Sequence, residues 1–135
     1  MNKIYICFVF AVFMSSCTTL NDRVLDSSQS QVQVRSYQTK SFDTTDKHNV
    51  LRNVVATMQD LGFIIDKADE DIGTVSGYSF TNKTNMTVSV REVNKQTVVR
   101  VNAEYNSKPV TEPLAYQNFF NALSQSLFLT ANDVL

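Results

Sequence analysis

Side chains that could carry out catalysis are few in this chain of 135 residues. His48 is the single histidine, and it stands beside Asp46 at the expected start of a helix. It could act as a base or a metal ligand. No second ligand lies at a workable spacing, however, so a solvated residue at a helix start is the better interpretation. The chain also lacks a glycine-rich phosphate loop and a Gly-x-Ser-x-Gly elbow. We therefore predict a protein that is not an enzyme, with no catalytic residue, no metal and no cofactor.

An acidic cluster, Asp66, Asp69, Glu70 and Asp71, precedes Gly73 and could be read as a calcium site. The calcium-binding EF-hand loop needs its glycine earlier in the acidic series and a glutamate at the end of the loop. This spacing does not satisfy that pattern. We interpret the cluster as a solvated β-turn.

Three basic residues are candidates for binding a partner. Arg91 and Arg100 are predicted to lie near each other on the polar face of a sheet, and Lys95 is predicted at the adjacent turn. Together they could recognise an acidic partner protein. Ordinary surface charge is the alternative explanation.

Three phenylalanines near the C-terminus, Phe119, Phe120 and Phe128, allow two interpretations. They could line a ligand groove between a helix and the sheet. Alternatively they pack in the hydrophobic core, as most aromatic side chains do, and we favour this second interpretation.

The N-terminus has the features of a signal peptide. Lys3 supplies a positive charge, and residues 4–14 form an apolar stretch followed by small residues. A helix of this length is too short to cross a hydrocarbon core of about 30 Å. The pattern therefore predicts a cleaved export signal and no permanent membrane span.

Residues 14–17, Met-Ser-Ser-Cys, close this stretch. They resemble the lipobox of bacterial lipoproteins, in which cleavage leaves a cysteine carrying diacylglycerol as the first mature residue. The resemblance implies that Cys17 is lipidated and that Cys7 departs with the signal. Lipoproteins retained at the inner membrane typically carry Asp after the cysteine, so Thr18 favours the outer membrane. The alternative is an ordinary secretory signal that leaves Cys17 as a free thiol.

These features predict three segments: a signal peptide at residues 1–16, a lipidated cysteine and flexible tether at residues 17–31, and an α+β domain at residues 32–135. The tether is polar and has no apolar period, and its expected reach is roughly 20 Å. The net charge of the whole chain is −1. Such a balance gives no electrostatic reason to expect nucleic acid as a partner.

The domain is expected to begin with a strand and a helix. Residues 31–35 alternate polar and apolar side chains, and we predict a strand that runs on through Tyr37 towards Phe42. Helix N-cap candidates at residues 43–46 precede an apolar stripe, and Gly62 stands where a left-handed residue would end the helix. The stripe consists of Leu51, Val54, Val55, Met58 and Leu61. Leu61 is expected to lie under the sheet.

Four more strands are expected. Residues 63–65 are apolar on both faces, which favours a central or covered strand. A turn at residues 69–71 leads to a strand at residues 73–80. A two-residue turn at Asn94 and Lys95 then predicts a hairpin in which Val90 faces Val99. In this register Met86, Val88, Val101 and Ala103 share that apolar face, while Thr87, Ser89, Arg91, Arg100 and Asn102 share the other. Val98, opposite Arg91, is the exception to the pattern.

The last element is a helix of up to about 20 residues, for which Thr111 is an N-cap candidate and Pro113 suits the first turn. Its apolar stripe consists of Tyr116, Phe119, Phe120, Leu123, Leu127 and Ala131. A sheet with one apolar face needs a cover, which two amphipathic helices supply. We predict an α+β fold, with a single mostly antiparallel sheet in the order β-α-β-β-β-β-α and two helices on one face.

The segment VVATMQDLGFIID at residues 54–66, followed by DEDIGTV at residues 69–75, resembles segments of small bacterial envelope lipoproteins of uncharacterised function. It is also similar to the helix-grip modules in the lipoprotein subunit of the outer-membrane β-barrel assembly machinery. In those modules a helix ends in Leu-Gly-Phe, a strand follows, and an acidic turn leads to a glycine. The resemblance covers about a quarter of the chain and implies a helix-grip-like fold.

Two classes of function fit these observations. The first is a non-enzymatic protein-interaction module, anchored to the outer membrane through Cys17, in an envelope assembly or transport complex with another envelope protein as partner. The second is a surface-displayed lipoprotein that contacts host cells or external ligands as an adhesin or antigen. Neither class involves nucleic acid.

Overall fold

A long hairpin forms the centre of the sheet in the computed structural model, which describes residues 30–132. Its strands are β4 (Thr84–Val93) and β5 (Gln96–Tyr105). Asn94 and Lys95 both have positive φ, 51° and 63°, as the central residues of a type I′ turn do. Val90 pairs with Val99, Val88 with Val101 and Met86 with Ala103, so the predicted register is confirmed.

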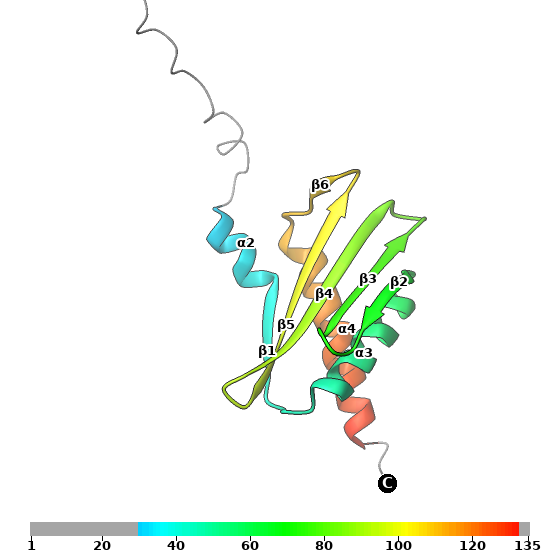
Figure 1. The fold of residues 1–135 in the computed structure, drawn as a ribbon. Coiled ribbons are helices and arrows are strands. Elements are labelled where there is room, and N and C mark those ends of the chain that lie inside the picture. Colours follow the sequence, from blue (N-terminus) through cyan, green and yellow to red (C-terminus); the bar gives the residue numbers. More distant parts are fainter. Residues whose placement is uncertain (1–29, 133–135) are drawn as a thin grey trace, which may run out of the picture.

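The other strands extend this hairpin on both sides (Figure 1). β3 (Thr74–Ser79) pairs with β4, and β2 (Ile64–Asp69) pairs with β3. β1 (Thr39–Phe42) and the short β6 (Lys108–Pro109) both pair with β5. The strand order is β1-β5-β4-β3-β2, and every pairing is antiparallel. The α+β class and the predicted order of elements are confirmed, with one short helix and β6 in addition.

Two helices, α3 (Lys47–Asp60) and α4 (Pro113–Asn132), pack on the same face of the sheet (Figure 1). Asp46 caps α3 by accepting a hydrogen bond from the backbone N–H of Asn49 at 2.9 Å. The core between helices and sheet consists of Val50, Leu51, Val54, Met58, Phe63, Val75, Met86, Val88, Val90, Val99, Val101, Ala103, Tyr116, Phe119, Phe120 and Leu123. The opposite face of the sheet has no helix over it within residues 30–132.

A buried amide joins the two helices. Asn53 on α3 accepts hydrogen bonds from the hydroxyls of Ser126, at 2.6 Å, and Thr130, at 3.0 Å, on α4. Its own amide nitrogen donates to the backbone carbonyl of Asn49 at 2.8 Å. Because a buried amide without partners would cost free energy, this arrangement favours one alignment of α4 along α3.

The predicted first strand is wrong over residues 31–37, which form helix α2 (Gln31–Tyr37). Ser30 and Gln33 make a reciprocal capping box at the start of this helix. The alternating valines that suggested a strand are not buried, and Val32 is 78% exposed. The strand begins only at Thr39, and α2 includes Gln31, which was predicted to end the tether. Residues 1–29, with the predicted signal, Cys17 and most of the tether, lie outside the described residues.

Tyrosines attach α2 to the rest of the domain. The hydroxyl of Tyr37 donates to the backbone carbonyl of Thr111 at 2.7 Å, and its ring centre lies 5.9 Å from that of Tyr116. Desolvation and, second, the proximity of Tyr116 raise the pKa of Tyr37 above its ordinary 10.0, so this hydroxyl stays protonated as a donor. Gln38, just after α2, donates its side-chain amide to the hydroxyl of Tyr116 at 3.1 Å.

Two predictions about the segment after α3 also need correction. Gly62 has a φ of +84°, as predicted for a residue that ends a helix, but Leu61 lies beyond the last turn and is 38% exposed. Phe63 enters the core instead. β2 is an edge strand rather than a central one, and Ile64 is 61% exposed.

Gly73 connects the turn after β2 to the sheet. Its φ is +77°, and its carbonyl accepts a hydrogen bond from the N–H of Val90 at 2.7 Å. A side chain at this position would collide with the carbonyl oxygen of Val90 and with Lys47. Glycine is therefore required here by backbone conformation and by space.

We predict that Met58→Ala destabilises the domain by about 2–5 kcal/mol, because Met58 is fully buried in the core. Leu61→Ala, one turn later and partly exposed, should cost less than about 1 kcal/mol. Urea unfolding followed by circular dichroism measures both. Equal losses from the two variants would contradict this placement of the helix end.

Candidate functional site

The open face of the sheet, which is the face opposite α3 and α4, carries mainly small polar side chains. Alternation along the strands places the odd-numbered residues of β4 and the even-numbered residues of β5 on it, as the pairing of Ser89 with Arg100 and of Thr87 with Asn102 shows. Ser76 and Tyr78 of β3 share this face. Such a face offers hydrogen-bond donors and acceptors over several strands and is the candidate functional site.

A hollow of about 320 Å³ lies at one end of the open face. Its lining residues are Thr39, Ser89, Arg91, Val93, Val98 and Arg100, and we call it the arginine hollow. Arg100 is paired with Ser89, and Arg91 is paired with Val98, two residues before Arg100 on β5. The predicted proximity of Arg91 and Arg100 is thus confirmed, while their role in binding stays a prediction. Lys95 is exposed in the turn and does not line the hollow.

The charges of the arginine hollow are not neutralised within residues 30–132. No carboxylate oxygen of that part of the chain lies within 4.0 Å of either guanidinium. The Nε atom of Arg100 is buried and makes no hydrogen bond there. Val93 and Val98 add apolar side chains to the lining of the same hollow. Two guanidiniums with free donors can bind a carboxylate or phosphate through paired hydrogen bonds.

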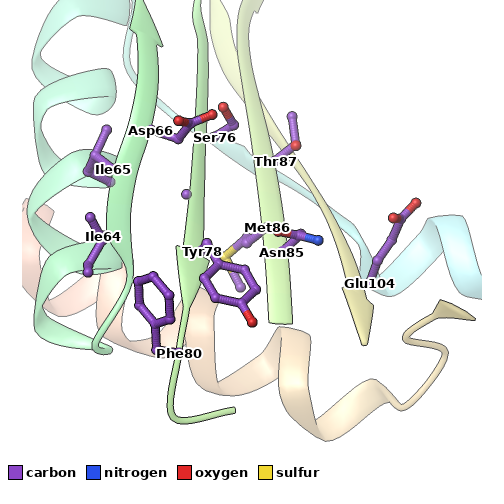
Figure 2. A pocket seen from close by; sticks show the side chains of 11 residues that line it. Ile64, Ile65, Asp66, Ser76, Tyr78, Phe80, Asn85, Met86, Thr87 and Glu104 are labelled. Carbon is purple, nitrogen blue, oxygen red and sulfur yellow. The ribbon is translucent and has the colours of Figure 1, made fainter. Parts of the chain in front are cut away.

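A second hollow, of about 440 Å³, lies toward the other end of the open face and reaches the edge strand β2 (Figure 2). Tyr78 and Phe80 form its aromatic part, with ring centres 4.7 Å apart in an edge-to-face arrangement. Phe80 is 71% exposed, and Ile64 lies beside it. Asp66 and Glu104 contribute carboxylates to the lining. We call it the aromatic hollow.

Sequence reasoning missed the aromatic hollow. The signal for it was the alternation of side chains between the two faces of the sheet. Tyr78 pairs with Ile64 on one side and with Asn85 on the other. These three residues therefore share a face, which a register for β2 and β3 would have shown. The apolar run at residues 63–65 obscured that register by suggesting burial of both faces.

His48 lies in the first turn of α3, where its side chain is 70% exposed. Its Nδ1 atom is 4.0 Å from a carboxylate oxygen of Glu70, a long and solvated contact that has electrostatic value only when the imidazole is protonated. Within residues 30–132, no three His, Cys, Asp or Glu side chains are grouped so that they could hold a metal ion.

The acidic cluster forms the turn between β2 and β3, as predicted. Asp69 accepts a hydrogen bond from the backbone N–H of Ile72 at 2.9 Å, and its carbonyl accepts one from Gly73, also at 2.9 Å. These bonds are those of an acidic side chain that stabilises a local turn.

The three phenylalanines near the C-terminus are not equivalent. Phe119 and Phe120 are buried in the core between α4 and the sheet, as we favoured. For Phe128 the favoured interpretation is wrong, because this side chain is 68% exposed on α4. No helix within residues 30–132 is long and apolar enough to span a membrane.

The chain matches none of the protein families with which it was compared, and no curated protein is significantly similar to it.

We predict that His48→Ala leaves both the unfolding midpoint and the yield of cross-linked partner proteins unchanged, because the imidazole is exposed and makes only one long polar contact. Thermal unfolding and cross-linking in cells measure the two quantities. Loss of partner yield in a variant that unfolds with the wild type would show that His48 acts in the function.

Proposed function

We propose that this chain is an outer-membrane lipoprotein, anchored through an acylated Cys17, that acts as a non-enzymatic interaction module in an envelope assembly or transport complex. The contact surface is the open face of the sheet, and the partner is another envelope protein. The proposal assigns no catalytic residue, cofactor or metal.

The observation that carries the proposal is the arginine hollow. Two guanidiniums lie together without a carboxylate partner within residues 30–132, beside two hydroxyl-bearing residues, Thr39 and Ser89. A surface that only had to remain soluble has no need to bring two like charges together, because their mutual repulsion costs free energy. An acidic group of a partner protein would neutralise both.

The anchor is supported by the lipobox-like residues 14–17 and by the apolar stretch before them. Export to the outer membrane is supported by Thr18. A tether that ends before α2, which begins at Gln31, would keep the domain close to the membrane surface.

The first test of this proposal concerns lipidation. Cys17→Ala should remove all incorporation of labelled palmitate and leave an uncleaved precursor or a form without acyl chains, because the thiol is the acceptor of the diacylglycerol. Cys7→Ala is the matched control and should be labelled like the wild type. Full labelling of the Cys17→Ala protein would refute the anchor.

The second test concerns the contact surface. Arg91→Glu combined with Arg100→Glu should lower the yield of partners cross-linked in cells, about tenfold or more, because four units of charge change on a surface that recognises an acid. Arg52→Glu reverses one exposed charge on α3, away from the open face; it is the control and should not change the yield. Unfolding midpoints close to the wild type would show that the domain stays folded. Unchanged partner yield from the double variant would move the contact to another surface.

Protease treatment of intact cells separates this function from that of an adhesin or antigen. A module that works in the periplasm is protected by the outer membrane, so the domain should remain uncut. Cleavage on intact cells would favour the surface-displayed alternative.

A further inference from the structure

Charges on the open face are distributed unequally along the strands. Arg91 and Arg100 lie toward the turn at residues 94–95, whereas Glu104 lies near the far end of β5, paired with Asn85. All three share the open face by the alternation of β4 and β5. The face is therefore basic at one end and acidic at the other along the central hairpin.

We infer that a second copy of this chain covers this face, with the two sheets packed face to face about a twofold axis at right angles to the strands. The inference rests on the proposed function in placing a contact on the open face, and it names the partner as the same protein. A twofold axis requires that each contact occur twice, so a face whose two ends carry opposite charge is self-complementary.

The register shows which residues would meet. We place the axis between the pair Ser89–Arg100 and the pair Thr87–Asn102. The pair Arg91–Val98 of one copy then lies over the pair Asn85–Glu104 of the other. Glu104 of one copy then lies over Val98 of the other copy. Val98 is the cross-strand neighbour of Arg91, and Arg100 lies two residues further along β5.

One carboxylate thus faces both guanidiniums of the arginine hollow, and the symmetry repeats this contact at the other end. Bidentate pairing of Arg with a carboxylate is the strong form of such a contact. The arrangement supplies the acidic group that is absent around Arg91 and Arg100 within residues 30–132 of a single copy.

The alternative axis, parallel to the strands, is disfavoured by the same charges. β4 is the middle strand in the order β1-β5-β4-β3-β2. An axis along β4 would place Arg91 of one copy over Arg91 of the other, and two like charges in contact oppose association.

The size of the face agrees with a dimer of moderate stability. β4 and β5 have ten residues each, which gives a length of about 34 Å, and five neighbouring strands span about 24 Å. Because the outer strands are shorter, the covered area is on the order of 700 Å² per copy, close to the ~800 Å² of a standard interface. Its polar character predicts that added salt weakens the dimer.

The test uses two differently tagged copies of the full chain, expressed together and extracted in mild detergent. Capture of one tag should retain the other copy. Copies that all carry Arg91→Glu and Arg100→Glu should lose retention about tenfold or more, because Glu then faces Glu104, and copies that all carry Glu104→Arg should lose it similarly. Arg52→Glu in both copies is the control and should leave retention unchanged.

The decisive sample combines the two kinds of variant, one per tag. In a mixed pair both contacts are again between opposite charges, so retention should return to within about twofold of the wild type. A mixed pair retained no better than either variant alone would overturn the inference. Wild-type copies that fail to retain each other would also overturn it.

These results separate the inference from the proposed function. In one outcome the mixed pair regains retention and the double-arginine variant still captures other envelope proteins. This outcome would support the dimer and contradict a contact between Arg91, Arg100 and another envelope protein. In the other outcome the double-arginine variant loses those proteins, and wild-type copies do not retain each other. This outcome would contradict the dimer and support the contact with another envelope protein.

Discussion

The two-residue turn at Asn94 and Lys95 determines the register of β4 and β5, and most of the domain depends on that register. With both residues at positive φ, the turn brings Val90 opposite Val99 and continues to Met86 opposite Ala103. A shift by one residue would exchange the two faces and place the arginines beneath the helices. The turn therefore decides at once which face α3 and α4 cover and where Arg91 and Arg100 emerge.

Covering one face leaves the other available. α3 and α4 together bury the apolar residues of the central strands, and the hydrogen bonds of Asn53 to Ser126 and Thr130 align the two helices. Because both helices are used on one side, the open face keeps its Ser, Thr and Asn side chains in contact with solvent or with a partner. The two hollows lie at opposite ends of this face, one lined by Arg91 and Arg100 and the other by Asp66 and Glu104. The proposed contact with another envelope protein depends on the basic end. The proposed dimer depends on the opposite charges of the two ends.

The parts of the fold that were predicted from the sequence are those in which a local pattern and burial agree. The hairpin register, the helix that follows the N-cap candidates at residues 43–46, and the last helix with Pro113 in its first turn belong to this group. The prediction at residues 31–37 was wrong because alternating valines resemble a strand, whereas the Ser30–Gln33 capping box, which the sequence also contains, starts a helix. Leu61 and Ile64 were misplaced because their apolar character says nothing of the edge position of β2. The proximity of Arg91 and Arg100 followed from the hairpin alone. The aromatic hollow needed the register of β2 against β3, and that register shifts at an irregularity between Ile65 and Lys67.

The central claim is that the open face of the sheet is the surface through which this protein makes its contacts. A photo-activated cross-linking amino acid at Asn102, which is exposed in the middle of that face, tests it most directly when compared with the same amino acid at the exposed Gln117 of α4. Irradiation of living cells should yield protein adducts from position 102 and few or none from position 117. Adducts from position 117 alone would contradict the account and place the contact surface on the outer side of the helices.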